Sequence, residues 1–325
     1  MKKFLALAAI SCVAMTLGLA PQAANAADRT FKVSHIFNTS HPVHKGLLKA
    51  KELLQEKSNG RLDLQIFPAG TYANYKDSIK AVRMGVLDLC PLDTAVDYYP
   101  ESGVLLSPYT FRDYDHWRSF KKSAVYDKLL DDIGDKVGVK QLSLYTFGFR
   151  HTTTKSVEAK TPEDFADLKL RVVNFPPYPE AATVLNAHGT PLPIGDVYMS
   201  LSSGVADGQE NPYTQILTMK FYEVQKYLIL TGHMLASSGT IMSQKSWNSL
   251  SPEDQKIVEE VFTAEAEAID EDVISNEAEM FRDLTENKGM IPVTVDKAPF
   301  MARVPLVLDK YPQFKELYEE IQAIK

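Results

Sequence analysis

The chain has 325 residues, of which 45% are hydrophobic and 24% charged, and its formal net charge is -7 at neutral pH. This acidic balance argues against nucleic acid or an anionic membrane surface as the partner. The length is compatible with two lobes, each with its own packed interior.

The start of the chain has the pattern of an export signal. A short basic start at residues 1–3 precedes a mostly apolar run over 4–20, and residues 24–26 offer the small-x-small pattern that signal peptidase reads. We therefore expect a signal peptide over 1–26 and a mature chain in the periplasm. No later stretch reaches the apolar length of a membrane span.

Only one of the two cysteines survives the predicted cleavage. Cys12 lies in the signal region, where lipidation is an alternative, but residues 9–11 lack the leucine that usually begins a lipidation motif. Cys90 remains alone in the mature chain, so an intramolecular disulfide is impossible there. A buried core thiol is the expected role of Cys90.

The mature chain begins with alternating strands and helices. Period-two or apolar runs predict strands over 31–35, 61–67 and 86–89, and amphipathic patterns predict helices over 42–58 and 76–84. This βαβα rhythm is typical of a largely parallel sheet flanked by helices, so an α/β fold is predicted.

A pattern in this first region recurs in the second half of the chain. In each copy an aspartate precedes a Gly-Val pair by eight residues, and a second aspartate follows that pair. One such echo can arise by chance, but its place in two α/β halves favours two similar lobes with a ligand between them. The two sets are Asp77, Gly85, Val86, Asp88 and Asp196, Gly204, Val205, Asp207.

The later elements are expected to join and brace the lobes. Apolar extended segments over 141–149 and 226–231 are predicted to cross between lobes. Ser251 is a good helix cap before a proline and an acidic first turn, so a long helix is predicted from there to about residue 287. Its acidic residues, Glu265 and Asp270 among them, are expected to face solvent.

The predicted domain division follows from these elements. A final helix over 311–324 is expected to pack back on a lobe. The predicted parts are a signal peptide at 1–26, mainly lobe 1 at 27–150, mainly lobe 2 at 151–240, and a crossing strand, the long bracing helix and C-terminal helices at 241–325.

Two arginines, Arg150 and Arg171, each end an apolar run, and a turn over 207–212 that contains Asn211 follows them. A buried guanidinium is costly unless an anion meets it, and its planar fork matches a carboxylate with two hydrogen bonds. The arrangement therefore suggests a carboxylate-binding site in an exported protein. The alternative is that each arginine pairs with a nearby aspartate or glutamate, and pattern alone favours that alternative for either one.

Aromatic residues follow Arg171 and Asn174 in a proline-rich stretch. Three prolines within residues 175–179 stiffen the chain, so an aromatic ring there would be held rigidly beside the arginine. Phe175 or Tyr178 is therefore a candidate ligand wall. Packing in the core or at an interface is the alternative.

A histidine cluster near the start of the mature chain allows a metal site as an alternative. His41 and His44 could present two imidazoles from a loop or a first helical turn, but no cysteine or carboxylate completes a compact ligand set. We therefore predict no metal and no cofactor. His35 and Asn38 are instead candidates to line a ligand cleft.

Known catalytic signatures are missing from the sequence. It contains no nucleophile elbow, P-loop or dinucleotide fingerprint. Asp93 and Asp97 follow a predicted strand, where open α/β sheets place their ligand sites. An acid–base pair is conceivable there, although loop carboxylates that cap helices or meet a ligand hydroxyl are the simpler interpretation. No catalytic residue is predicted.

Several motifs stand out along the chain: Gly148-x-Arg150-x-Thr152-Thr153, Leu168-Lys169-Leu170-Arg171-Val172-x-Asn174, Val205-x-Asp207-Gly208-Gln209-Glu210-Asn211-Pro212, Ser58-x-Gly60-Arg61 and Phe67-Pro68-Ala69-Gly70. Together they resemble the periplasmic solute-binding proteins of TRAP transporters (tripartite ATP-independent periplasmic), also called the C4-dicarboxylate-binding or DctP-like family. The similarity runs from about residue 31 to 260.

The resemblance implies two α/β lobes that close over an organic acid, joined by crossing strands and braced by a long helix. It implies that Arg171 forms a salt bridge with the ligand carboxylate and that Arg150 and Asn211 assist. Asn174 falls where some members contact ligand, and Asp93 falls at a first-lobe position that varies with ligand. The implied partners are a small organic acid and the small and large membrane permease subunits, and a monomer is expected.

The sequence departs from some members of this family. Sialic-acid binders carry an arginine where this chain has Val96, and their second-lobe aromatic falls near Ile194, so these positions argue against a sialic-acid ligand. The loop over 72–74 also differs from the common family pattern. The alternatives to a transport receptor are a periplasmic hydrolase or lyase acting on an organic acid, or the ligand-reporting subunit of a sensor.

Overall fold

The computed structural model describes residues 27–93 and 95–325. The predicted signal peptide, its cleavage site and Cys12 lie outside these residues. In the part of the chain that the structure describes, no helix has the length and apolarity needed to cross a membrane.

Within the described residues, nine strands form one mixed sheet in the order β2-β1-β3-β8-β4-β7-β5-β6, and β9 pairs with β8 outside this path. The strands are β1 (Arg29–Ser34), β2 (Leu62–Phe67), β3 (Leu89–Leu92), β4 (Val139–Thr154), β5 (Lys169–Val172), β6 (His188–Pro191), β7 (Gly208–Asn211), β8 (Tyr227–Ser243) and β9 (Ile291–Val293).

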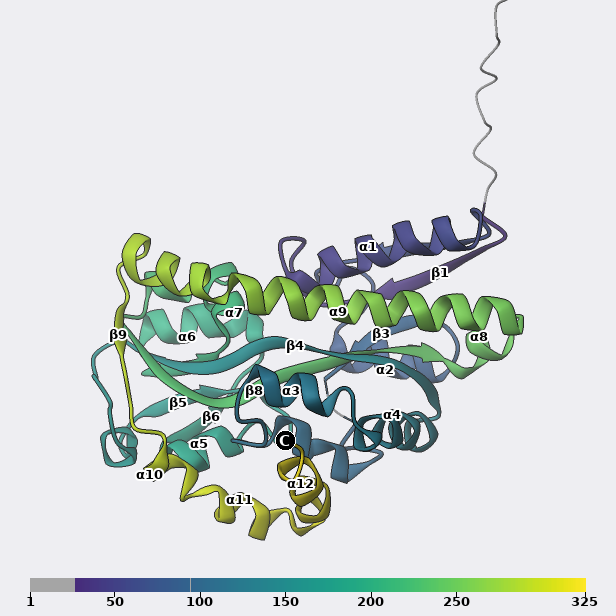
Figure 1. Ribbon diagram of the computed structural model, residues 1–325. Helices are drawn as coiled ribbons and strands as arrows, with labels where there is room; N and C mark the ends of the chain where they lie inside the picture. Colours follow the sequence, from purple (N-terminus) through teal and green to yellow (C-terminus); the bar gives the residue numbers. More distant parts are fainter. Residues whose placement is uncertain (1–26, 94) are drawn as a thin grey trace, which may run out of the picture.

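Helices cover this sheet and connect its strands (Figure 1). The α-helices are α1 (Pro42–Lys57), α2 (Tyr75–Arg83), α3 (Tyr114–Phe120), α4 (Ala124–Val137), α5 (Glu180–Leu185), α6 (Val197–Ser203), α7 (Tyr213–Thr218), α8 (Gln244–Asn248), α9 (Pro252–Arg282), α10 (Ala298–Met301), α11 (Val304–Lys310) and α12 (Lys315–Gln322).

The sheet has two halves with the same connectivity, which confirms the predicted two-lobed α/β fold. The first lobe contains the parallel strands β2-β1-β3, and the second lobe contains the parallel strands β6-β5-β7. In each lobe the third strand then pairs antiparallel with one of the two long strands, β3 with β8 and β7 with β4. Each lobe thus repeats one βαβ arrangement.

The recurring pattern of an aspartate, a Gly-Val pair and a second aspartate has a structural basis in this repeat of the lobes. Asp88 accepts a hydrogen bond from the backbone nitrogen of Lys32 on β1 at 2.8 Å, and Asp207 accepts one from the backbone nitrogen of Lys169 on β5 at 2.9 Å. In both lobes the aspartate ties the start of the third strand to the first strand. The glycine that ends the preceding helix has a positive φ in each lobe, 69° at Gly85 in the first.

The third strand of the first lobe lies later than predicted. The strand expected over 86–89 is instead Leu89–Leu92, and the residues before it form a turn. Val86 is 60% exposed there, although its apolar character suggested a strand. The Asp88 side chain holds this turn against β1, so the strand begins only after it.

The two long strands β4 and β8 run through both lobes side by side. They extend beyond the predicted crossings at 141–149 and 226–231. The second half of β8 is rich in Gly, Ala and Ser and buried on both faces, so it lacks the alternation that signals a strand. The predicted domain boundary between residues 150 and 151 falls inside β4, and the boundaries stay a prediction.

Helix α9 packs along both lobes, as Figure 1 shows, in the role predicted for a bracing helix. The expectation that all its acids face solvent is wrong for two of them. Glu265 is fully buried and accepts a hydrogen bond from Thr240 at 3.1 Å. Asp270 is also buried and accepts bonds from the Trp117 indole and the Lys121 ammonium. These partners offset the cost of burial, and a sequence pattern does not reveal them.

The end of the chain differs slightly from the predicted helices. Helix α9 continues as one π-helical turn over Asp283–Asn287, close to its predicted end. The final helix expected over 311–324 is shorter, because a 3-10 turn over Pro312–Phe314 precedes α12. The apolar residues of α12 pack into the first-lobe core, as the buried Leu317 and Ile321 show.

Candidate functional site

A cavity of about 510 Å³ lies between the lobes, lined by residues of both and of the long strand β4. Parallel strands of each lobe end at its walls, the position where open α/β sheets place ligand sites. Its walls include the side chains of Phe37, Tyr75, Asp93, Phe147, Arg150, Arg171, Phe175, Tyr178 and Asn211.

Arg171 enters this cavity from β5 and is only 1% exposed. Its Nε and Nη2 atoms donate to the backbone oxygen of Leu192 at 3.0 and 2.6 Å. The remaining nitrogen, Nη1, is buried and has no hydrogen-bond partner. Burial lowers the pKa of the Arg171 guanidinium to about 10, so it stays charged at neutral pH. A buried cation with a free donor favours an anion beside it.

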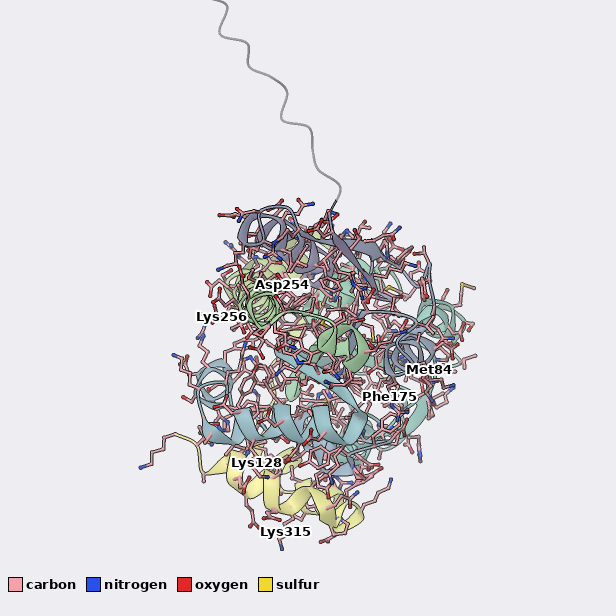
Figure 2. All side chains as sticks on the ribbon, turned by 90° about the vertical axis from the view of Figure 1, so that its right-hand side faces the viewer. Met84, Lys128, Phe175, Asp254, Lys256 and Lys315 are labelled. Carbon is pink, nitrogen blue, oxygen red and sulfur yellow. The ribbon has the colours of Figure 1, made fainter. Side chains whose placement is uncertain are left out.

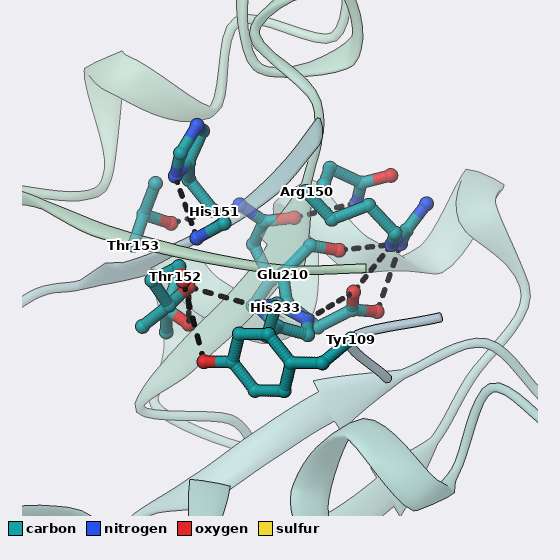
Figure 3. Close-up of polar contacts among 11 residues, drawn as sticks. Tyr109, Arg150, His151, Thr152, Thr153, Glu210 and His233 are labelled. Atoms are coloured by element: carbon teal, nitrogen blue, oxygen red, sulfur yellow. Dashed lines mark hydrogen bonds and ion pairs between the residues drawn. The ribbon is translucent and has the colours of Figure 1, made fainter. Parts of the chain in front are cut away.

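Arg150 is paired within the protein, which is the alternative that the sequence left open for it. Its Nη2 donates to Oε1 of Glu210 at 2.8 Å and to the Glu210 backbone oxygen at 2.6 Å, and its Nε donates to Oε2 (Figure 3). Nε2 of His233 lies 3.3 Å from the same carboxylate. Burial opposes ionisation, but Arg150 and His233 together lower the pKa of Glu210 to about 2.

Asn211 and Asn174 both line the cavity, at different depths. Asn211 is buried, and its amide nitrogen donates to the side-chain oxygen of Gln209 at 2.5 Å. Gln209 in turn donates to Thr153 at 2.9 Å, so a chain of polar side chains fixes the Asn211 amide. Asn174 is exposed and belongs to the rim of the cavity.

The predicted aromatic wall also borders the cavity. The rings of Phe175 and Tyr75 stack with centroids 5.5 Å apart and planes 10° apart. Because Tyr75 begins α2 in the first lobe and Phe175 follows β5 in the second, this stack bridges the two lobes. Tyr178 meets Phe175 edge to face, and its ring centroid lies 5.0 Å from the Arg150 guanidinium. In Figure 2, Phe175 lies to the right of the centre of the molecule, and Lys256 of α9 lies at its left edge.

Asp93 brings a carboxyl group to the first-lobe side of the cavity. Its Oδ1 atom is buried without a hydrogen-bond partner, while its backbone nitrogen donates to the Tyr75 hydroxyl at 2.7 Å. Burial raises the pKa of Asp93 to about 6. The paired rings of Phe37 and Phe147, 5.3 Å apart, form the neighbouring apolar wall.

His35 and Asn38 are not among the residues that line this cavity. His35 is buried, and its Nε2 lies 3.0 Å from Nδ1 of His44. Asn38 is exposed in the turn before α1. His41 caps α1 by accepting a hydrogen bond from Val43. Among residues 27–93 and 95–325, no group of three or more His, Cys, Asp or Glu side chains is arranged to hold a metal ion.

Sequence reasoning missed four residues that shape the site. Glu210 lies inside the turn that was singled out, but only the structure shows it beside Arg150. Tyr75, Phe37 and Phe147 line the cavity from separate elements. Tyr75 directly follows the loop that departs from the family pattern, and that departure was the one available signal.

Comparison with known proteins agrees with this architecture. A solute-binding protein of Roseobacter denitrificans is 29% identical over 92% of this chain and 91% of its own length. The sialic acid-binding periplasmic protein of Vibrio cholerae is 30% identical over 77% of this chain and 78% of its own. The crystal structure of a TRAP periplasmic solute-binding protein of a Polaromonas species, bound to D-erythronate, has a TM-score of 0.84 and 28% identity, and the match covers 91% of this chain and 99% of that one.

The family model for bacterial extracellular solute-binding proteins of family 7 (DctP) matches residues 33–313. This range contains the crossing strands, α9, nearly all of both lobes and every residue that lines the cavity. The chain belongs to this family of solute-binding proteins.

Proposed function

We propose that this chain is the periplasmic receptor of a TRAP transporter, which captures a small organic acid between its lobes and delivers it to the small and large permease subunits. The observation that carries this function is the buried, unpartnered Nη1 of Arg171 at the wall of the cavity. A carboxylate is the anion that such a donor fits best among small solutes.

The surroundings of Arg171 support the same role. The Leu192 carbonyl accepts hydrogen bonds from two nitrogens of Arg171 and so holds the side chain in place. Binding of an anion to the third nitrogen therefore costs little side-chain entropy. The positive charge of Arg150 is neutralised by Glu210, which leaves Arg171 as the uncompensated cation among the buried lining residues that the structure describes. We assign Arg171 as the residue that pairs with the ligand carboxylate. Asn211 and Arg150 are assigned as residues that assist it.

The relatives support an organic acid as the ligand class. Their names and structures include sialic acid and D-erythronate as ligands. The relatives compared are solute-binding proteins, which supports a binding role without catalysis for this chain. Export by the predicted signal peptide over 1–26 would place the receptor in the periplasm.

A binding experiment with a matched control tests the assignment. Organic acids are screened by the thermal stabilisation they confer, and the affinity of the best acid is measured by calorimetry. Arg171→Ala should weaken its binding well over tenfold, because loss of a buried charge-assisted pair costs about 2–5 kcal/mol. Arg303→Ala is the control, since Arg303 also grips a backbone carbonyl, that of Thr183, but outside the cavity.

Equal affinities in the Arg171→Ala variant and the wild type would contradict the assigned anchor. Delivery is tested separately with proteoliposomes that contain the permease subunits. Uptake of the labelled acid should require the chain, and uptake that is independent of the chain would contradict the receptor role.

A further inference from the structure

Several polar groups of the cavity already have partners within the protein. Arg150 is bound by Glu210, and the Asn211 amide nitrogen by Gln209. Asn74 caps α2, where its side chain bonds Asp77 twice, at 2.7 and 3.0 Å. These bonds use part of the hydrogen-bonding capacity of each group.

Two buried side-chain atoms of the described lining residues remain without a partner. They are Nη1 of Arg171, a donor from the second lobe, and Oδ1 of Asp93, an acceptor from the first lobe. A ligand that satisfies both needs one acceptor group and one donor group. A second carboxylate beside Asp93 would meet a like charge, and the one lysine among the described lining residues, Lys76, is exposed to water.

The remaining wall is largely apolar and aromatic. Phe37 and Phe147 form one pair of rings, and Phe175 with Tyr178 forms another. Both pairs line the same cavity as the two unpartnered atoms. Hydroxyl groups buried against these rings would lose their hydrogen bonds to water, whereas a flat apolar body would gain contact.

We propose that the ligand is an aryl monocarboxylate with one hydrogen-bond donor at its far end. Its carboxylate meets Arg171, its donor meets Asp93, and its ring packs between the Phe37–Phe147 pair and the Phe175–Tyr178 pair. This inference rests on the proposed function and narrows it to one class of organic acid. It distinguishes this cavity, with its aromatic walls, from one lined mainly by polar partners for the several hydroxyls of a sugar acid.

Calorimetry on the chain purified from periplasm tests the class with three probes: 4-hydroxyphenylacetate, phenylacetate and D-gluconate. The measurement is made at pH 8, where Asp93 is ionised. The hydroxylated aryl acid should bind at least about tenfold more tightly than D-gluconate, because hydroxyls of gluconate would be buried against the aromatic walls. It should also bind more tightly than phenylacetate, which has no donor for Asp93.

Two pairs of variants locate the contacts. Asp93→Leu should abolish the preference for 4-hydroxyphenylacetate over phenylacetate, while Asp97→Leu, at an exposed position of the same loop, should leave it unchanged. Phe175→Ala should weaken 4-hydroxyphenylacetate about fivefold or more through loss of ring contact. Phe67→Ala is its control, because Phe67 is a partly buried ring in an aromatic pair outside the cavity.

Tighter binding of D-gluconate than of both aryl acids would overturn this inference and leave the proposed function intact. So would an unchanged preference in Asp93→Leu. If the folded chain binds none of the three probes, the inference fails, and the wider screen with Arg171→Ala then decides the proposed function on its own.

Discussion

The two lobes have the same strand connectivity but bring opposite chemistry to the cavity. Lys32 on β1 and Lys169 on β5 occupy equivalent places, because each donates its backbone nitrogen to the aspartate before the third strand. Two residues further along, the first lobe has Ser34 and the second lobe has Arg171. Ser34 is buried and accepts a hydrogen bond from Ser78 within the lobe.

Because of this difference, the second lobe would anchor the ligand and the first lobe would cover it. The second lobe contributes the cation, its backbone support and the neutralised Arg150–Glu210 pair. The first lobe contributes the rings of Phe37 and Tyr75 and the unpartnered Oδ1 of Asp93. A ligand would therefore gain its charge pairing from the second lobe alone, and the contacts of the first lobe then favour the closed state by differential affinity.

The largest expected effect concerns the ion pair between Arg150 and Glu210, for which the first lobe has no charged residue at the equivalent place of its third strand. In the equivalent place of β3, the residue that corresponds to Glu210 is Pro91, which carries no charge. Glu210→Ala leaves Arg150 buried without its partner and should destabilise the fold by about 3–5 kcal/mol. Urea unfolding measures this loss. A loss below about 1 kcal/mol would show that the pair can be dispensed with.

The pH dependence of stability should differ between two buried glutamates. Burial raises the pKa of Glu265 to about 8, so its ionisation favours the unfolded chain and stability should fall as pH rises from about 5 to 8, by at most about 1.4 kcal/mol per unit. Glu210, with a pKa of about 2, contributes stability that is lost only as pH falls through its folded value. Unfolding of Glu265→Gln across this range should show a flatter profile than the wild type. Parallel profiles would contradict the burial argument.

Arg171→Lys tests whether the ligand needs the planar guanidinium of arginine or only a positive charge. Lysine keeps the positive charge but cannot hold the Leu192 carbonyl and a carboxylate in the same plane, so binding should weaken about tenfold. Ser34→Ala, the equivalent position in the first lobe, should leave ligand affinity within about twofold. Calorimetry with the best acid measures both. Full affinity in Arg171→Lys would mean that charge alone recognises the ligand.

The smallest effect concerns the aspartates that open the third strands. Asp88→Ala should cost about 1–2 kcal/mol, because this carboxylate also bonds Arg29 at 3.0 Å and Ser246 at 2.5 Å. Asp207→Ala should cost about 1 kcal/mol, since its further ion pair with Lys169 is long at 3.9 Å. Thermal unfolding of both variants gives the ranking, and the reverse order would contradict the argument from the additional partners of Asp88.

Much of the fold was accessible from the sequence because it depends on local patterns. The alternation of apolar residues gave the first lobe, and the cap at Ser251 placed the start of α9 correctly. The small residues in the second half of β8 hid a strand, because their burial on both faces removes the alternation. Buried Glu265 was missed because its partner Thr240 is distant in the chain.

The candidate site was accessible only in part, for the same reason. Arg171, Phe175 and Tyr178 lie within one short segment, so their shared place at the cavity follows from proximity in sequence. The pairing of Arg150 depends on a neighbouring strand, and periodicity does not choose between a ligand and Glu210 as its anion. Tyr75 meets Phe175 only because the two lobes face each other.

The continuity of β4 and β8 has a mechanical consequence. Since both strands pass unbroken through the two lobes, the lobes share one sheet and are not linked by flexible loops alone. The register of β4 shifts three times, the last shift between Arg150 and Thr152, and bulges locally increase strand twist. Opening and closing would then twist this shared pair of strands, and Arg150 lies beside one of its register shifts.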